Sequence, residues 1–209
     1  MSLATDHTGL SRLYALHAAR WHDSISRLGY PDAYRLLTSA DRAARSDIPK
    51  AVLDAGCGTG AFAEIFAVQW PEADLTLLDP SPEMLAQAKH RDWPTSPRVI
   101  QGGLSHLQAA AGNFDTILCA HVLEHLPDFD AGLDQLCQSL KPGGSLLLSV
   151  SKPHWCTALL RWRWGHKAYR PEQVCKALDC RGLTDVTVVP FRKGPPSRTS
   201  SGYRAVRPV

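Results

Sequence analysis

Three glycines and an acid stand close together in the stretch KAVLDAGCGTGAFAEIF, which runs from Lys50 to Phe66. An apolar run ends at Asp54, and Gly56, Gly58 and Gly60 follow at alternate positions. Glycines at this spacing let the main chain turn tightly from a strand into a helix and let a ligand lie against backbone amides. The stretch therefore predicts a nucleotide-type cofactor bound where the strand meets the helix.

A second acid, Asp79, stands 23 positions after Gly56 and ends the next apolar run, LTLLD. A carboxylate at the end of a second strand can accept hydrogen bonds from both hydroxyls of a ribose. The letters GCGTGA also satisfy the dinucleotide fingerprint G-x-G-x-x-[GA], with Ala61 last. The pattern alone therefore fits two cofactor classes, NAD and an adenosyl compound.

Asp54 separates these two classes by its charge. A dinucleotide presents its pyrophosphate to the glycine loop, and a carboxylate just ahead of the glycines repels it. The same carboxylate attracts an ammonium or a sulfonium group, and S-adenosylmethionine carries both, with an adenosine for Asp79 and no phosphate. The sequence therefore favours S-adenosylmethionine, although a carboxylate that only fixes the turn through loop amides also explains Asp54.

Two histidines, His121 and His125, follow the apolar run FDTILCA. They lie one turn apart and share a face if the stretch HVLEHL is helical. Methyl transfer from a sulfonium needs mainly orientation and desolvation, and a base only where the acceptor loses a proton in the step. Histidine suits that task near neutral pH, so both are catalytic candidates beside the methyl group, with packing or capping as the alternative role.

The elements that position these residues alternate between strands and helices. From Lys50 onward, short apolar runs alternate with amphipathic stretches, and helical segments begin near Ala61, Pro82, Val122 and Pro171. This alternation predicts an α/β fold with a doubly wound, mostly parallel sheet. Ligands bind at the carboxyl ends of the strands in such sheets, so four clusters should face one crevice. These clusters are residues 54–60, Asp79, residues 102–104 and residues 120–125.

The two ends of the chain depart from this pattern. Residues 1–48 carry helical periodicity, interrupted at Gly29–Pro31. The last two apolar runs, DVTVVPF and YRAVRPV, are joined by RKGPPSRTSSG, which leaves no room for a crossover helix. We therefore expect these two strands to pair as an antiparallel hairpin at one edge of the sheet.

Size and composition predict one globular domain, since the chain has 209 residues, 44% hydrophobic and 21% charged. Because no apolar run approaches the roughly 18 to 20 residues of a membrane span and the N-terminus lacks the apolar centre of a signal peptide, we expect a cytoplasmic protein. The six cysteines form no C-x-x-C pair. We expect reduced, packed thiols and no metal site, with a thiol cluster for a soft metalloid as the alternative.

The net charge of +3 is unevenly distributed along the chain. Residues 161–209 contain eleven Lys or Arg against three acids, a net charge of +8, which leaves −5 for the residues before them. This basic region suits an anionic small substrate, a lipid surface or nucleic acid. A solvated basic face is the alternative.

Four stretches occur in order between Ala51 and Val150: VLDAGCGTG, LLDPSPEMLAQAK, FDTILCAHVLEHLPD and LKPGGSLLLSV. They resemble the class I S-adenosylmethionine-dependent methyltransferases, specifically the small-molecule group that includes the ubiquinone and menaquinone biosynthesis enzymes. The resemblance implies a Rossmann-like, seven-stranded sheet with an antiparallel last strand. It also implies an N-terminal helical cap of the same domain over residues 1–48, a methyltransferase domain over residues 49–209, and a substrate-covering insertion at about residues 152–172.

The resemblance implies roles for individual residues. The cofactor-binding set comprises Asp54, Gly56, Cys57 and Gly58 at the methionine moiety, Asp79 at the ribose, Pro80 and Met84 at adenine, and Gly103, Leu104 and Ala120 nearby. Tyr14 and Trp21 match aromatic positions of a helix folded over the cofactor, with core packing as the alternative. Where many relatives read GDA after the third strand, with the Asp on the adenine amino group, this chain reads GGL at 102–104, so only backbone groups serve there.

The segment after the fifth strand, SKPHWCTALLRWRWGHKAYRP, gathers aromatic and cationic side chains: Trp155, Trp162, Trp164, Tyr169, Arg161, Arg163 and Arg170. Aromatic walls and guanidinium groups suit an aromatic or anionic acceptor, whereas the alternative is an amphipathic helix packed on the sheet. We therefore expect an enzyme that transfers the methyl group of S-adenosylmethionine to a small-molecule acceptor.

Three other functions stay open. A methyltransferase for nucleic acid or protein would use the basic C-terminal region, but the fourth strand ends in CAHV and lacks the Asn/Asp-Pro-Pro-aromatic signature of base-amine methylation. An NAD-dependent oxidoreductase rests on the glycine pattern alone, and a cofactor-holding module without catalysis rests only on the departure at Gly103. We expect no membrane span and no nucleic-acid partner, and the oligomeric state stays undetermined.

Overall fold

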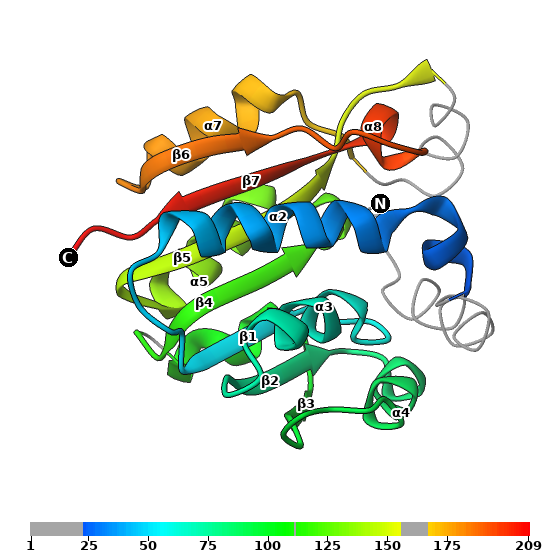
Figure 1. Cartoon of the computed structure of the whole chain (residues 1–209). Coiled ribbons are helices and arrows are strands. Elements are labelled where there is room, and N and C mark those ends of the chain that lie inside the picture. The colour runs from blue at the N-terminus through cyan, green and yellow to red at the C-terminus, as the bar shows by residue number, and fades with distance from the viewer. Residues whose placement is uncertain (1–22, 111, 156–166) are drawn as a thin grey trace, which may run out of the picture.

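Figure 1 shows the computed structural model of the chain, which describes residues 23–110, 112–155 and 167–209. In this part of the chain seven strands form one sheet, in the order β3-β2-β1-β4-β5-β7-β6. The strands are β1 (Ala51–Ala55), β2 (Asp74–Asp79), β3 (Arg98–Gln101), β4 (Phe114–Ala120), β5 (Leu140–Ser151), β6 (Thr184–Val189) and β7 (Ser200–Val206). Neighbouring strands are parallel except where β7 pairs with β5 and β6. The predicted α/β fold with an antiparallel last strand is confirmed.

Helices cover both faces of this sheet (Figure 1). They are α2 (Tyr30–Ala44), α3 (Ala61–Gln69), α4 (Pro82–Lys89), α5 (Phe129–Ser139), α7 (Pro171–Asp179) and α8 (Pro196–Thr199), with the 3-10 turns η1 (Leu104–Ala110) and η2 (Leu123–His125). Side chains alternate along each strand, so Leu147 belongs to the apolar cluster that includes residues of α2, α3 and α4, while Leu146 and Leu148 belong to the cluster that includes residues of α5 and α7. Both faces are buried, which explains why the strands read as nearly continuous apolar runs.

Local signals set where the helices begin at the carboxyl edge of the sheet. Ser81 Oγ accepts the N–H of Met84 at 3.2 Å, and Pro82 occupies the first turn of α4. Asp128 accepts the N–H groups of Asp130 and Ala131 at 2.9 and 3.1 Å at the start of α5. These caps hold the segments that follow β2 and β4 in fixed positions.

The last two strands form the predicted antiparallel hairpin. β6 pairs with β7, and β7 pairs in turn with β5, so β6 is the edge strand. Their connection contains the single helical turn α8, which the sequence pattern did not predict, because Pro195 and Pro196 begin a turn without an apolar periodicity. The boundary near residue 48 between cap and sheet stays a prediction.

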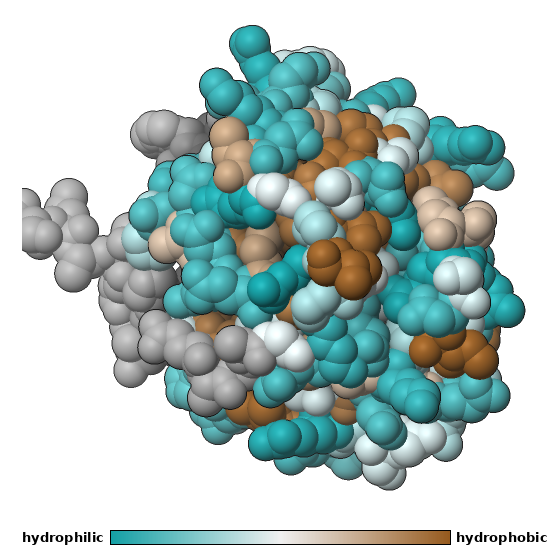
Figure 2. Space-filling view, turned by 90° about the vertical axis from the view of Figure 1, so that its left-hand side faces the viewer, coloured by the Kyte–Doolittle hydropathy of each residue, from teal (hydrophilic) through white to brown (hydrophobic). Residues whose placement is uncertain are grey.

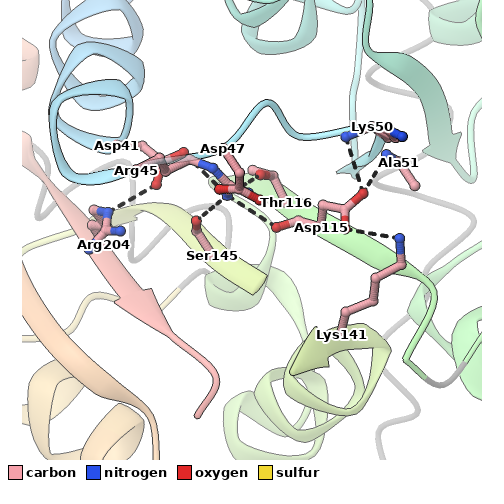
Figure 3. Close-up of polar contacts among 10 residues, drawn as sticks. All are labelled: Asp41, Arg45, Asp47, Lys50, Ala51, Asp115, Thr116, Lys141, Ser145 and Arg204. Atoms are coloured by element: carbon pink, nitrogen blue, oxygen red, sulfur yellow. Dashed lines mark hydrogen bonds and ion pairs between the residues drawn. The ribbon is translucent and has the colours of Figure 1, made fainter. Parts of the chain in front are cut away.

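A polar network joins α2 to the sheet at the end where the parallel strands begin (Figure 3). Arg204 Nε donates to Asp41 Oδ1 at 2.9 Å, and both side chains are buried. Arg45 Nη1 donates to Thr116 Oγ1 at 3.0 Å and to Ser145 Oγ at 2.6 Å. The network fixes α2 across β4, β5 and β7, so the opposite end of α2 is held over the carboxyl edge. Figure 2 views the molecule from the network's end of the sheet, where hydrophilic residues cover most of the surface.

Candidate functional site

The glycine loop between β1 and α3 has a backbone that favours glycine. Gly56, Gly58 and Gly60 have φ angles of 71°, 53° and 80°, in the left-handed region. The N–H groups of Gly56 and Cys57 donate to the Leu78 carbonyl at 2.7 and 3.0 Å, which ties the loop to β2. A side-chain carbon placed on Gly58 would meet no described atom within 4 Å, so the loop borders open space there.

Asp54 lies beneath this loop at the end of β1, and only 1% of it is exposed. Its Oδ2 accepts the N–H of Ala63 in the first turn of α3 at 3.1 Å. Burial raises the pKa of Asp54 to about 7, the Ala63 hydrogen bond opposes that rise, and the charge of Asp79 adds to it. Within the described part of the chain this buried carboxylate accepts one hydrogen bond, and a nearby cation would favour its ionised form.

Asp79 connects the glycine loop to the start of α4. Its Oδ2 accepts the N–H of Gly58 at 2.8 Å, and its Oδ1 accepts the N–H of Ser81 at 2.9 Å. Burial raises its pKa, and the two backbone hydrogen bonds oppose the rise. Each carboxylate oxygen has a second lone pair, so Asp79 can accept further hydrogen bonds from a ligand.

The residues predicted to flank adenine lie just after Asp79. Pro80 is exposed, while Met84 is buried in α4 with 3% exposure. Cys57 is buried in the glycine loop, and burial raises the pKa of its thiol, which is a neutral group at neutral pH. Ala120 is half-buried at the end of β4. The structure therefore gathers these positions at one end of the sheet.

His106 lies beside the segment in which this chain departs from its relatives. A side-chain carbon placed on Gly102 would lie 2.6 Å from His106 Nδ1, so the ring packs on that glycine. Nδ1 also lies 3.2 Å from the Gly103 carbonyl oxygen, and η1 begins at Leu104. Gly103 itself borders open space. Sequence reasoning missed His106, and its signal was a polar ring four residues after Gly102.

His121 occupies a strained position directly after β4. Its φ of 57° is in the left-handed region, and its N–H donates to the Ser149 carbonyl at 2.8 Å. The ring Nδ1 lies 3.0 Å from Glu124 Oε1 and 3.2 Å from Ser151 Oγ, and Nε2 lies 3.1 Å from Ser149 Oγ. The Tyr30 ring meets the imidazole edge to face, with centroids 5.1 Å apart. Residues from α2, β5 and η2 thus converge on this imidazole.

Glu124 is the functional candidate that sequence reasoning missed. It is 2% exposed, and its Oε1 accepts the N–H of Ser151 at 2.7 Å. Burial alone would raise its pKa, but the hydrogen bond and charge of His121, with backbone N–H groups, lower the pKa to about 2. Its signal in the sequence was the H-x-x-E spacing within HVLEHL.

The stretch HVLEHL is not one continuous helix. Only Leu123–His125 form the turn η2, and the left-handed backbone of His121 lies outside it, so the two histidines do not share a helix face. His125 donates its N–H to the Val122 carbonyl at 3.0 Å. Val122 packs on the glycine loop, since a side-chain carbon on Gly56 would lie 2.2 Å from Val122 Cγ2. His121 directly precedes Val122 in the chain, so the contact of Val122 with Gly56 places His121 beside the glycine loop.

Several predicted residues lie outside the part of the chain that the structure describes: Tyr14, Trp21, Arg161, Trp162, Arg163 and Trp164. Trp155 is 83% exposed, and Tyr169 packs on Phe129 with ring centroids 4.2 Å apart. Within residues 23–110, 112–155 and 167–209, no cluster of His, Cys, Asp or Glu could hold a metal ion. No helix in those ranges is long and apolar enough to cross a membrane.

Basic side chains gather at the carboxyl edge of the sheet, next to the cluster around His121. Lys152 follows β5, and its Nζ donates to the Ser197 carbonyl at 2.9 Å. Arg192, Lys193 and Arg198 are exposed in the connection from β6 to β7. None of these four forms an ion pair with another described residue. Their charge is therefore available to an anionic ligand.

Comparison with known proteins gives one family and several relatives. A family profile described as "Methyltransferase domain" matches residues 24–188. The ubiquinone biosynthesis O-methyltransferase of Xanthomonas campestris is 39% identical over 147 residues, which are 68% of this chain and 60% of that protein. The malonyl-[acyl-carrier protein] O-methyltransferase of Xylella fastidiosa is 35% identical over 140 residues, 65% of this chain and 46% of that protein. The chain thus spans about half the length of these relatives.

A solved structure extends the similarity. The N-methyltransferase NodS of Bradyrhizobium japonicum, in complex with S-adenosyl-L-homocysteine, superposes with a TM-score of 0.67 at 26% identity. The match covers 86% of each chain.

Proposed function

This chain belongs to the methyltransferase domain family, and from that premise we propose that it transfers the methyl group of S-adenosylmethionine to a small-molecule acceptor. The observation that carries this proposal is the pair of buried carboxylates on either side of the glycine loop in the chain: Asp79 bonds to Gly58 within the loop, and Asp54 bonds to Ala63 in the helix that follows it. Family membership also favours a cationic ligand for Asp54 over a dinucleotide, because a pyrophosphate would be repelled there.

The residues of this site fit S-adenosylmethionine. Asp54, a buried carboxyl with a raised pKa, is stabilised in its ionised form by the positively charged methionine portion. Asp79 has acceptor capacity left for the ribose hydroxyls. Gly58 leaves open space for the ligand, and the buried Thr59 hydroxyl has no hydrogen-bond partner among the described residues. When bound, S-adenosylmethionine supplies an electrophilic methyl group on a positively charged sulfur.

The other predicted residues complete this proposed site. Gly56, Cys57 and Gly58 surround the methionine moiety, Pro80 and Met84 flank adenine, and Gly103, Leu104 and Ala120 line its remaining edge. Tyr14 and Trp21 cover the cofactor from the N-terminal region. His106 lies beside Gly103, the position where relatives have an acid, and its exposed ring offers the polar edge that the glycines lack. His121 and His125 are the candidate catalytic residues.

The acceptor is a small molecule with negative charge. Lys152, Arg192, Lys193 and Arg198 supply positive charge, which no acid among the described residues pairs, at the edge of the sheet where the acceptor approaches. The relatives named above are, by their names, an O-methyltransferase of ubiquinone biosynthesis and an O-methyltransferase of malonyl-[acyl-carrier protein], and those acceptors belong to those proteins. Here the basic side chains and the family support an anionic acceptor.

Calorimetric titration of the whole chain with S-adenosylmethionine, S-adenosylhomocysteine and NADH tests the proposal. We expect both adenosyl ligands to bind with micromolar dissociation constants. Asp79→Asn removes the charged acceptor for the ribose and should weaken both affinities by about tenfold or more, which corresponds to about 1.4 kcal/mol.

The matched control is Asp74→Asn at the opposite end of the same strand, where the side chain is exposed. This variant should bind S-adenosylhomocysteine like the unchanged protein. Binding of NADH without binding of either adenosyl ligand would contradict the proposal.

A further inference from the structure

The buried Glu124 and the partly exposed His121 form a pair of a kind that prepares an imidazole to accept a proton. Glu124 is an ionised carboxylate, and such a group only accepts hydrogen bonds. The 3.0 Å contact with His121 therefore places a proton on Nδ1, which donates to Glu124 Oε1. In the neutral ring Nε2 is then the acceptor, and the Ser149 hydroxyl donates to it at 3.1 Å. Nε2 thus carries the basic lone pair of the ring, which accepts the Ser149 hydrogen bond in this arrangement.

Of the side chains that contact the imidazole, Glu124 and Ser149 are buried, whereas the imidazole itself is partly exposed. The side chain of His121 is 22% exposed, whereas the side chain of Glu124 is 1% exposed and Ser149 is 1% exposed. The next residue, Val122, packs on Gly56 of the glycine loop, so the ring lies beside the proposed cofactor site. Burial of the Ser149 hydroxyl excludes it as a nucleophile toward an external molecule in this arrangement.

Once protonated, the imidazole of His121 places a positive charge beside Glu124, with Nδ1 3.0 Å from Glu124 Oε1. The titratable side chains that feel the charge of Glu124 are Tyr34 of α2, Cys119 of β4, Tyr169 ahead of α7 and Tyr203 of β7. Burial first, and the negative charge of Glu124 in addition, raise the pKa of each of these four groups. They are therefore neutral near neutral pH, and a positive charge on the imidazole would be stabilised by Glu124.

We propose that His121, held by Glu124, is the base that removes the proton of a hydroxyl acceptor, so that the enzyme is an O-methyltransferase. This inference rests on the proposed function above. A hydroxyl keeps its proton near neutral pH and must lose it as the carbon–oxygen bond forms, whereas a neutral amine attacks with a free lone pair.

In the step, the acceptor hydroxyl replaces the Ser149 hydroxyl at Nε2 and gives its proton to that nitrogen. The oxygen electron pair forms the bond to the methyl carbon, and the electrons of the breaking sulfur–carbon bond stay on sulfur, which leaves S-adenosylhomocysteine. The imidazolium, stabilised by the carboxylate of Glu124, then returns its proton to water. His121 is the catalytic residue of this step, and Glu124 is a positioning residue that acts through it.

The first test reads the tautomer directly and needs no acceptor. Nitrogen NMR of the whole chain labelled in its histidines should show His121 as the Nδ1–H tautomer, assigned by loss of the signal in His121→Asn. Asparagine suits this position because it tolerates a left-handed backbone. Glu124→Gln should reduce the Nδ1–H population, and Glu72→Gln, an exposed control, should not. An Nε2–H tautomer in the unchanged protein overturns the proposal, because Nε2 would then carry no free lone pair.

The second test uses p-hydroxybenzoate and catechol as hydroxyl probes and p-aminobenzoate as the amine probe, with S-adenosylmethionine as donor. We expect transfer to a hydroxyl probe that falls by about 100-fold in His121→Asn and in Glu124→Gln. Affinity for S-adenosylhomocysteine should stay unchanged in both variants. Transfer confined to the amine, or no transfer to either hydroxyl probe by protein that binds S-adenosylhomocysteine, overturns the inference. Loss of adenosyl binding in the unchanged protein contradicts the proposed function instead.

Discussion

The carboxylate of Asp79 accepts the N–H of Gly58 at 2.8 Å, so the acid that ends β2 is bonded to the loop that follows β1. The two strands are neighbours and run in the same direction, with Ala55 opposite Leu78. Their carboxyl ends therefore meet, and two acids 25 positions apart in the sequence lie at the same edge: Asp79 bonds to the loop, and Asp54 bonds to Ala63 in the helix after the loop. A change in the loop should therefore act on the ligand directly and through Asp79.

Gly58→Ala should separate backbone strain from ligand contact. The φ of 53° costs an alanine about 1 kcal/mol of stability, and its methyl group would enter the open space beside the loop. We expect a matching loss of unfolding free energy and at least about a tenfold loss of affinity for S-adenosylhomocysteine.

The control for this variant is Gly182→Ala. Gly182 also has a left-handed φ, 72°, and no described atom within 4 Å, but it follows α7 away from the glycine loop. It should lose similar stability and keep its affinity for the ligand. Equal affinities for the two variants would show that Gly58 does not border the cofactor.

The raised pKa of Asp54, about 7, predicts a pH-dependent affinity. Because the folded pKa lies above the unfolded value of 3.8, Asp54 contributes stability at low pH that is lost as the pH rises toward 7.

An amino-acid ammonium group favours the ionised carboxylate of Asp54, so ligand binding should release a proton below about pH 7. The affinity for the ligand should therefore rise between about pH 6 and 8. Calorimetry of S-adenosylhomocysteine binding in buffers of different ionisation enthalpy measures that proton. Asp54→Asn should abolish the release, and proton uptake by the unchanged protein would refute the assignment.

The glycine loop and the sheet could be predicted because their signals are local. Glycine spacing, an acid at the end of an apolar run and the alternation of strands with helices each lie within a few residues. The hairpin of β6 and β7 followed from the length of one connection. Such features need no knowledge of which distant segments pack together.

The surroundings of His121 could not be predicted, because its partners come from distant parts of the chain. Ser149 and Ser151 lie on β5, about thirty residues later, and Tyr30 lies on α2, about ninety residues earlier. Helical spacing in HVLEHL suggested a continuous helix, but the N–H of His121 bonds to the Ser149 carbonyl and its backbone is left-handed. Tertiary contacts thus override the local helical pattern, and the same contacts bury Glu124.

The buried pair Asp41–Arg204 should be the main anchor of α2. Arg204→Met leaves Asp41 buried without its 2.9 Å partner, which should lower the unfolding free energy by about 3 to 5 kcal/mol in urea denaturation. The double variant Asp41→Asn/Arg204→Met should recover part of this loss. Arg35→Met, which breaks the exposed pair with Asp32, is the control and should change stability by less than about 1 kcal/mol. Equal effects of the two single variants would mean that Arg204 does not anchor the helix.

Glu124 predicts how the stability of the protein depends on acid. Burial alone would raise its pKa, but the hydrogen bond and charge of His121 outweigh burial and hold the pKa at about 2, against 4.5 for the free side chain. Because the folded pKa is depressed, the ionised carboxylate contributes stability above about pH 4.5, and this contribution is lost as the pH falls toward 2.

Glu124→Gln removes this contribution. The difference in unfolding free energy between the unchanged protein and Glu124→Gln should therefore be largest near neutral pH, at about 3 kcal/mol, and should shrink below about pH 4.5. Urea denaturation at several pH values measures this difference, and a difference that stays constant from pH 7 to pH 3 would show that Glu124 is not held ionised by His121.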